Sequence, residues 1–501
     1  MKKLYTFGEF LNYMLEKRSI TILELQSMLG LKSRTMIYRV IQEEAKLSTL
    51  LDMKDDIAIA LELTPSEMKE METSLNVSTL GKETIYTQEK ILEFLKNTRD
   101  KRIPNTDFNK ILCFSDKTFD SIEDILNSYS TSNILEINII NCISKEFMYK
   151  LSKFIQKTYT NYESIKIEHV IQMNKSSSSN IDTLECILEL LSFKYYNAYY
   201  NPDVNMMLDN NFSVLSDILI IKSKTGTRER FDLLKLDKPN QTISYYSSND
   251  INFYNLNLNI FLDLKASCRL LTTNFDNEDF LENIIDISNY YFELEKNTNS
   301  FMLKPDPCYS TIGSSIILNM INTSPELLSI SGIKDSPRLA LIKENLVDRF
   351  DNINKKHRYT TDIFSISGID NLISKRKLTD HVWGLREFNL DEIKKILVDT
   401  LQLHLSLDNN YKFFIAKDFL FDSSFFLYYI ENKLVTLENF NQKYNDDFKT
   451  IAITSKTFIT SFDNFFKNVL LTDYIFSEEE GVTFMNKKIK EVDDMIKAGQ
   501  K

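Results

Sequence analysis

Apolar residues near the N-terminus recur three and four residues apart, a spacing that places them on one face of an α-helix. Over residues 7–17 this pattern predicts a helix whose apolar face holds Phe7, Phe10, Leu11, Met14 and Leu15. The pattern continues over residues 47–76, where Leu63-Thr64-Pro65 divides two further helices. Thr64 suits a helix N-cap and Pro65 the first helical position. We therefore expect the first 80 residues to be helical.

Between these segments, residues 19–44 have the pattern of two short helices joined by a glycine turn. The apolar face of the first helix consists of Ile22, Leu25 and Leu29. Gly30 permits the left-handed turn that follows, and Ser33 is expected to be the N-cap of the second helix. That helix is expected to bury Ile37, Val40 and Ile41. The side chains left facing solvent are Lys32, Ser33, Arg34, Thr35, Tyr38, Arg39 and Gln42. Side chains of these types contact phosphates and base edges in DNA.

The five predicted helices, with a helix-turn-helix in the middle and LELTPSEM at residues 61–68 opening the fifth, resemble the Cro/C1 (Xre-like) repressor domain. The resemblance covers about the first 80 residues of 501. It implies that the seven exposed residues bind double-stranded DNA and that the protein regulates transcription. The family has a small residue where this chain has Gln26, and the turn here is one residue longer. The pattern also suits a helical bundle that contacts only other proteins.

From Phe108 onward, short apolar runs alternate with longer amphipathic segments, the pattern of an α/β layer. We expect strands at residues 134–140, 165–173, 215–222, 242–247, 256–264, 411–417, 425–430, 434–437 and 450–454. Helices are expected at residues 118–129, 144–158, 181–193, 280–296, 339–350, 390–405, 456–471 and 478–496.

The expected fold is multidomain, α and α/β, with an N-terminal five-helix helix-turn-helix domain followed by a large mixed α/β body. The first domain takes residues 1–80, and residues 81–107 form a linker that contains a helix at 88–98. Two prolines in residues 304–310 divide the body into a first part, 108–303, and a second part, 304–501.

Composition and charge place the expected DNA contact at the N-terminus. With 43% apolar and 26% charged residues, the chain has the make-up of a globular protein that buries large cores. It shows no signal peptide and no apolar run of about 18 residues, so we expect a cytoplasmic protein without membrane contact. Residues 1–50 hold eight Lys and Arg against five Asp and Glu, net +3, and the rest of the chain has a net charge of −14. An acidic body disfavours contact with phosphate. The N-terminal helix-turn-helix domain, called the head below, is therefore the expected site for nucleic acid.

The usual signatures of cofactor and metal chemistry are missing from the sequence. No two of the ten glycines are closer than the 16 positions between 368 and 384, too sparse for a loop that binds phosphate. The five cysteines are never closer than 29 residues, and the four histidines include no HExxH. We therefore expect no cofactor, no metal and no catalytic residue.

A few charged residues of the body are candidates for contact with an anion or effector. His169 shares a strand face with Ile167 and Ile171, which also suits a histidine of the core. Two further basic groups are equally compatible with a solvated surface: Arg228 and Arg230 on a predicted turn, and Lys375 and Arg376 near a second cluster at 355–358.

The sequence therefore predicts a sequence-specific DNA-binding transcription regulator and not an enzyme. One head makes a small interface, so a homodimer is expected, held together by the body. The body would sense a peptide, small molecule or protein. Two alternatives stay open: an enzyme or defence effector with a dispersed active site in the body, and a non-catalytic scaffold for protein contacts.

Overall fold

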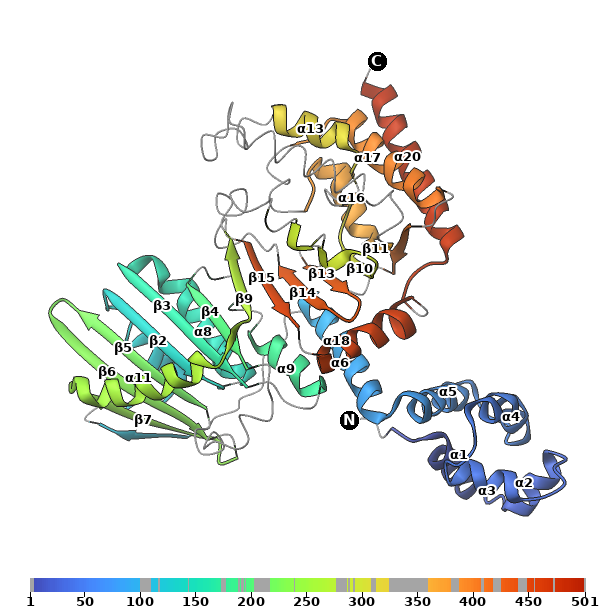
Figure 1. The fold of residues 1–501 in the computed structure, drawn as a ribbon. Coiled ribbons are helices and arrows are strands. Elements are labelled where there is room, and N and C mark those ends of the chain that lie inside the picture. The colour runs from blue at the N-terminus through green and yellow to red at the C-terminus, as the bar shows by residue number, and fades with distance from the viewer. Residues whose placement is uncertain are drawn as a thin grey trace. The chain divides into compact units, whose positions relative to one another are not determined.

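The structure of the chain is a computed structural model. It describes residues 4–99, 110–115, 118–142, 144–172, 177–187, 190, 193, 195–201, 217–237, 239–275, 286, 289–291, 293–307, 312–323, 359–379, 387–406, 410–417, 425–439, 448–454, 456–471 and 474–499. The chain is a mixed α/β protein with a helical N-terminal region and two mixed β-sheets (Figure 1). It divides into two compact units, of which the first holds Met1–Ile91 and Ser176–Ser178.

The N-terminal region is helical, as the apolar spacing predicts. Its first five helices are α1 Phe7–Arg18, α2 Ile22–Met28, α3 Thr35–Ile41, α4 Leu47–Ala60 and α5 Pro65–Leu80. Helices α1, α2 and α5 each begin with a threonine that forms a reciprocal capping box with a glutamate. The inward faces of the five helices form one core, which includes Phe10, Met14, Leu25, Ile37, Val40 and Ile57.

The connection to the body is a single glycine followed by a long helix. Gly81 has φ +85°, and α6 runs from Lys82 to Arg99. The predicted helix at 88–98 therefore begins six residues earlier, at Lys82. Helix α5 continues to Leu80, so the expected loop between these helices is reduced to Gly81.

The first sheet has the strand order β1-β7-β6-β5-β2-β3-β4-β8. Its strands are β1 Lys110–Phe114, β2 Ile134–Ile140, β3 Ser164–Ile171, β4 Tyr196–Tyr200, β5 Ile218–Thr225, β6 Arg228–Asp237, β7 Thr242–Ser248 and β8 Arg269–Leu270. The helices of this part are α7 Ile122–Asn127, α8 Lys145–Thr158, the short 3₁₀ helix η1 Tyr159–Asn161, α9 Ser177–Ile187 and α11 Ile251–Ala266.

The strand expected at 256–264 is wrong, because these residues belong to helix α11. Leucine and asparagine alternate here and imitate the period of a strand. The helix is set instead by its cap and its packing. Asp250 caps its N-terminus, and Tyr254 and Phe261, seven residues apart, are buried against the sheet residues Ile140, Val170 and Phe231.

The second sheet has the order β12-β11-β10-β13-β14-β15-β9. Its strands are β9 Thr272–Phe275, β10 Asn299–Lys304, β11 Tyr359–Ser365, β12 Tyr411–Ala416, β13 Phe425–Ile430, β14 Leu434–Asn439 and β15 Phe448–Ile453. Its helices are α13 Ser314–Thr323, α16 Ile366–Lys375, α17 Leu390–Leu405, α18 Lys456–Phe465, the π-helical turn η5 Phe466–Leu470 and α20 Glu478–Gly499. The chain passes from one sheet to the other between Leu270 and Thr272, so the predicted division at residue 304 falls within the second sheet. The helix expected at 339–350 lies outside the described residues.

The two sheets repeat one topology. Read from its outer strand, the first runs β1-β7-β6-β5-β2-β3-β4, and the second runs β9-β15-β14-β13-β10-β11-β12. In each sheet, three successive parallel strands lie on one side, and the next three strands along the chain add antiparallel on the other. Two features differ. The first sheet continues beyond β4 to an eighth strand, β8, which has no counterpart among the described strands of the second sheet. In addition, β1 is parallel to β7 whereas β9 is antiparallel to β15. The body therefore contains two sheets that share a seven-strand order.

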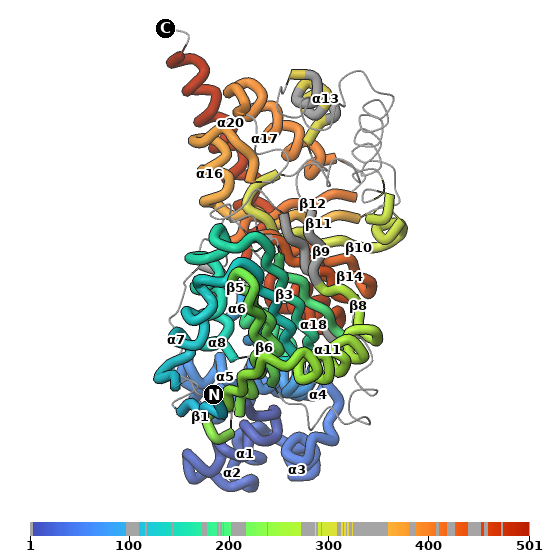
Figure 2. Tube along the Cα trace, turned by 90° about the vertical axis from the view of Figure 1, so that its left-hand side faces the viewer, coloured from blue at the N-terminus to red at the C-terminus, as the bar shows by residue number. Residues whose placement is uncertain are grey.

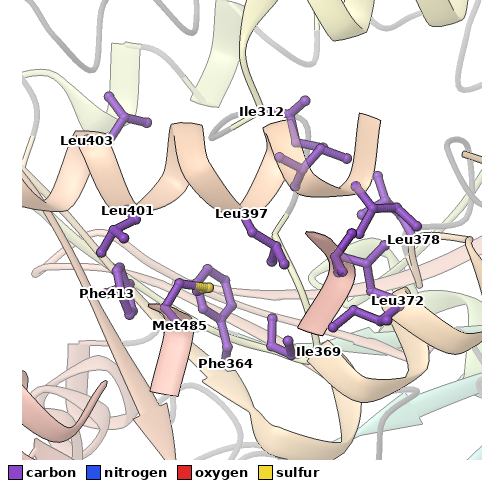
Figure 3. Packing of buried hydrophobic residues seen from close by; sticks show 14 of the residues in the cluster. Ile312, Phe364, Ile369, Leu372, Leu378, Leu397, Leu401, Leu403, Phe413 and Met485 are labelled. Carbon is purple, nitrogen blue, oxygen red and sulfur yellow. The ribbon is translucent and has the colours of Figure 1, made fainter. Parts of the chain in front are cut away.

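Helices α16, α17 and α20 cover one face of the second sheet, and both views of the fold place them together (Figure 2). The core between them contains Phe364 of β11 and Phe413 of β12 from the sheet, and Leu397 and Met485 from α17 and α20 (Figure 3). The opposite face holds Phe301 and Tyr429, whose rings stack on Phe466 of η5. Among the described helices, none has the length and apolarity needed to span a membrane.

Candidate nucleic-acid interface

The helix-turn-helix of α2 and α3 has a regular turn. Thr21 caps α2, with its hydroxyl accepting the Glu24 N–H at 3.2 Å while the Glu24 carboxylate accepts the Thr21 N–H at 2.7 Å. The carboxylate also accepts the Thr21 hydroxyl at 2.7 Å, and the two bonds that it accepts lower the pKa of Glu24, the one from the Thr21 N–H having the largest effect. After α2, Gly30 has φ +62°, the left-handed conformation that the sequence predicts.

Gln26 supports this turn from within. Its side-chain amide donates a hydrogen bond of 2.9 Å to the carbonyl oxygen of Leu31. The position that is small in the resembling family is therefore filled by a side chain whose polar end binds the backbone across the turn. Gln26 and the longer turn belong to one arrangement, and Leu25 beside it is fully buried.

The prediction of Ser33 as the N-cap of the second helix is wrong. The N-cap of α3 is Arg34, with φ −74° and ψ −12°, and no side chain caps the helix. A capping side chain needs an extended backbone at the N-cap, and Arg34 is already helical. Ser33 instead lies exposed in the loop before the helix.

All seven residues predicted to contact DNA are exposed, on α3, in the loop that leads into it or at its C-cap: Lys32, Ser33, Arg34, Thr35, Tyr38, Arg39 and Gln42. The exposed side chains of α3 are Thr35, Tyr38 and Arg39, and the C-cap residue Gln42 continues their spacing, opposite the buried Ile37 and Val40. Tyr38 is 43% exposed although it is a large aromatic residue. The polar face and the core face of α3 are therefore cleanly separated.

The positive charge of the α3 surface is confined to Lys32, Arg34 and Arg39. No ion pair involving Lys32, Arg34 or Arg39 is found among the described residues, whereas Lys17 and Arg18 both pair with Glu67. The guanidinium of Arg39 makes one long hydrogen bond, 3.4 Å, to the carbonyl of Glu44. Over residues 1–80 there are ten Lys and Arg against twelve Asp and Glu, net −2, because α4 and α5 are acidic. Attraction to DNA would therefore come from the α3 side of the head and not from its total charge.

His169, a candidate effector contact, lies in the interior of the first sheet. Its ring nitrogens lie 2.8 Å from the Tyr196 hydroxyl and 2.6 Å from the Asn141 carbonyl oxygen. Burial lowers the pKa of His169 to about 4. Both nitrogens are used by the fold, so an effector would have to displace one of these bonds.

The second sheet carries a buried polar group at the equivalent place, which the sequence analysis missed. His169 lies between Ile139 and Ala198 in the strand register, and Asp362 lies between Met302 and Phe413. In both sheets a tyrosine two residues before the third-strand partner binds this group: Tyr196 binds His169, and Tyr411 binds Asp362 at 2.9 Å. Lys304, two residues after Met302, forms a buried ion pair of 2.7 Å with Asp362. The buried pair of a tyrosine and a polar group is thus a repeated internal feature of the fold, and Lys304 is an addition in the second sheet.

Arg230 is also committed to the first sheet. Its guanidinium pairs with the buried Asp232 at 2.6 Å and lies 4.5 Å from the centre of the Tyr129 ring. The hydroxyls of Tyr129 and Tyr245 donate hydrogen bonds of 2.6 and 3.0 Å to the Asp232 carboxylate. Arg228, at the start of β6, is exposed.

The remaining candidates, Lys375 and Arg376, are exposed at the end of α16, where Arg376 adopts φ +56°. The basic residues 355–358 lie outside the described part of the chain. Contacts within the described residues do not join His169, Arg228 and Lys375 into one site.

A hollow of about 340 Å³ lies between α13 and α17. Lys395, Asp399 and Gln402 line it from α17, and Gly313 and Ser315 from the start of α13. Burial raises the pKa of Asp399, and the ammonium of Lys395 lies 3.8 Å from its carboxylate. The volume is in the range of ligand pockets, and the lining is mixed, since Leu403 and Gly313 lie beside the polar side chains.

Comparison with known proteins adds little to this geometry. No family model matches the chain, and no curated protein matches it. Among solved structures, the chain is similar to the crystal structure of polyphosphate kinase from Porphyromonas gingivalis, with 9% identity and a TM-score of 0.21. The match covers 67% of this chain and 46% of that one. A likeness of this degree supports no argument on fold or activity.

Proposed function

We propose that the protein is a sequence-specific DNA-binding transcription regulator. The observation that carries the proposal is the separation of α3 into a buried apolar face and an exposed face of Thr35, Tyr38 and Arg39. Lys32 and Arg34 precede this exposed face, and Gln42 continues it at the C-cap. A helix of this kind, held by a second helix across a tight turn, fits the major groove of DNA.

The side chains divide by chemistry. Arg34 and Arg39 can each donate two parallel hydrogen bonds to guanine, and Gln42 has the amide that suits adenine. Lys32, Ser33, Thr35 and Tyr38 can donate to phosphate oxygens and fix the register of the helix on the duplex. Because the head as a whole is slightly acidic, we expect weak non-specific binding and a strong dependence on the correct base sequence.

A single head of this size buries a small interface, and two heads on a two-fold axis are the usual solution. We therefore propose a homodimer held by the body. An effector that binds the body would act by its different affinity for two arrangements of the heads. Its chemical class stays open between peptide, small molecule and protein.

Recovery of DNA from fragmented genomic DNA by the full-length protein tests the proposal. The parent protein should retain one or a few discrete sequences. The Arg34→Ala/Arg39→Ala variant should lose them, whereas Arg269→Ala, which removes an exposed arginine of β8, should retain them. Recovery of no discrete sequence by the parent protein would favour the scaffold and overturn the regulator.

A further inference from the structure

Helix α11 has an uncharged face that is open to solvent. From Ile251 to Leu262 the chain has no Asp, Glu, Lys or Arg over 12 residues, although 26% of the whole chain is charged. Leu256 is 68% exposed, and Ile251 and Leu262 are each 45% exposed. Tyr254 and Phe261 are buried on the other side, against the first sheet. Large apolar side chains that lie together on a surface are a common mark of a contact with another molecule.

The exposed face has a defined internal order. At 3.6 residues per turn, Asn252, Asn255 and Asn259 lie along its middle, between Ile251 and Leu262 at one margin and Leu256 at the other. All three asparagines are exposed. An asparagine amide carries both donors and an acceptor, so two copies of such a row can bind each other.

The repeated topology shows the equivalent position in a covered state. Helix α18 follows β15 as α11 follows β7, and α18 and η5 bury Ile459, Phe462, Phe465, Phe466 and Leu470. No large apolar side chain of 459–471 is among the exposed ones. The end of α6 belongs to the same compact unit, with Phe94 and Leu95 buried and the Lys96 ammonium 6.0 Å from the Tyr474 ring centre.

We propose that the exposed face of α11 binds α11 of a second copy of this chain, antiparallel about a two-fold axis near Asn257. The inference rests on the proposed function in one respect, the need for two heads. The distribution of charge favours this surface. The chain has a net charge of −11, so two copies repel each other. The 12-residue stretch has no charged residue, so two copies can meet there without that repulsion. The same patch on both subunits is the requirement of a two-fold contact.

In this arrangement Asn255 lies opposite Asn259 of the second copy, and the pair occurs twice. Asp263, the first charge after the stretch, lies near the first turn of the opposing helix, where the helix dipole favours a carboxylate, although Asp250 caps the same end. A helix of 16 residues is about 24 Å long. The contact is therefore at the small end of stable interfaces, and we expect a dissociation constant of about micromolar size.

Sedimentation velocity of the full-length protein, without DNA, tests the contact. Over concentrations of about 1–50 μM, the range set by the expected affinity, the parent should approach twice its mass of 58.7 kDa. Leu256→Arg/Leu262→Arg should be monomeric, with unchanged circular dichroism because both side chains are exposed. The matched control is Leu405→Arg, at a leucine of α17 that is 59% exposed, and it should dimerise as the parent does. A monomeric parent, or a double variant as dimeric as the parent, would overturn the proposal.

Complementary charges give a second readout that misfolding cannot imitate. A chain with Asn255→Lys and Asn259→Lys should repel its own copy, and so should a chain with Asn255→Asp and Asn259→Asp. An equimolar mixture should form heterodimers. If the mixture stays monomeric, α11 is not the interface.

The two proposals fail separately. Dimerisation through α11 without recovery of discrete DNA sequences would leave the interface standing and overturn the regulator. Discrete DNA sites bound by a protein that dimerises regardless of α11 would leave the regulator standing and overturn this interface.

Discussion

At the scale of single residues, α3 separates the side chains that hold it from those available to DNA. Its orientation depends on the buried Ile37 and Val40 and on Gly8 of α1. A Cβ atom at Gly8 would lie 2.7 Å from the Val40 carbonyl oxygen and 2.6 Å from that of Ile41, closer than atoms can pack. Arg34 and Arg39, in contrast, face solvent. Binding and stability can therefore be changed independently.

Arg34→Ala or Arg39→Ala should weaken binding to a recovered DNA site by about 1–3 kcal/mol if the arginine binds guanine. Fluorescence anisotropy with the full-length protein measures this. Neither change should alter urea unfolding of residues 1–91 followed by circular dichroism. Leu25→Ala should instead destabilise that fragment by about 2–5 kcal/mol, because it leaves a cavity in the core. Arginine variants that bind as tightly as the parent would show that α3 is not the recognition helix.

Residue exposure on a short helix could be predicted because it follows from spacing alone, and all seven candidate DNA contacts are exposed. The interaction partners of a residue could not. Ser33 has the right chemistry for an N-cap, yet the backbone of Arg34 shifts the helix start by one residue. Lys304 and Asp362 are 58 positions apart in the sequence, and only the pairing of β10 with β11 brings them together. His169 fits its strand pattern, but the pattern does not reveal Tyr196 or Asn141.

At the scale of elements, Glu67 joins the end of α1 to the start of α5. Its carboxylate accepts hydrogen bonds from Arg18 at 2.7 Å and Lys17 at 2.8 Å, and from the Thr64 N–H at 2.9 Å in the capping box. These bonds, with Arg18 first, hold the pKa of Glu67 well below its ordinary value of 4.5. One carboxylate thus caps α5 and forms ion pairs with both cations at the end of α1.

Glu67→Gln should destabilise residues 1–91 by about 1–2 kcal/mol at pH 7, since it weakens the cap and both ion pairs. The pKa is lower in the folded state, so the carboxylate stabilises the head above pH 4.5, and this stabilisation declines as the pH falls below that value. The difference between parent and variant in urea unfolding should therefore shrink between pH 5 and about pH 3. Glu72→Gln, at an exposed glutamate of α5, is the control and should have little effect at any pH. A difference that stays constant with pH would exclude this role for Glu67.

Whether a segment is a helix or a strand could be predicted where its apolar period and its length indicate the same element. This is so for β2, β13 and α17, whose predicted bounds are those of the structure. The prediction failed at α11, where leucine and asparagine alternate. The outer face of α11 is uncharged and mixes leucine with asparagine, so the helical period of its buried side is hidden. The uncharged outer face that misled the prediction is the surface we propose for dimerisation.

At the scale of the whole molecule, the α/β class of the body could be predicted from alternating strands and helices, but its repeat could not. The two sheets share a strand order and a buried polar position, yet that position is histidine in the first sheet and aspartate in the second. Burial and hydrogen bonding can be satisfied by different side chains, so a topology can repeat without a visible sequence repeat. The repeat indicates which positions the fold keeps polar. It also shows that, of the two helices that follow β7 and β15, α11 has exposed apolar residues, whereas none is found among the described side chains of α18.

Removing residues 1–81 should separate DNA binding from dimerisation. The cut at Gly81 leaves α6 whole, and among the buried residues of that helix Ile85 loses its cover of Leu4 and Val77. The remaining 82–501 should sediment as a dimer, because α11 lies in the body, and should fail to retain the DNA sites of the parent, because α3 is gone. The converse variant, Leu256→Arg/Leu262→Arg in the full chain, should be a monomer that binds one half-site weakly. A body that becomes monomeric without its head would place the dimer contact in the head, and a body that still retains the same DNA sites would remove α3 from recognition.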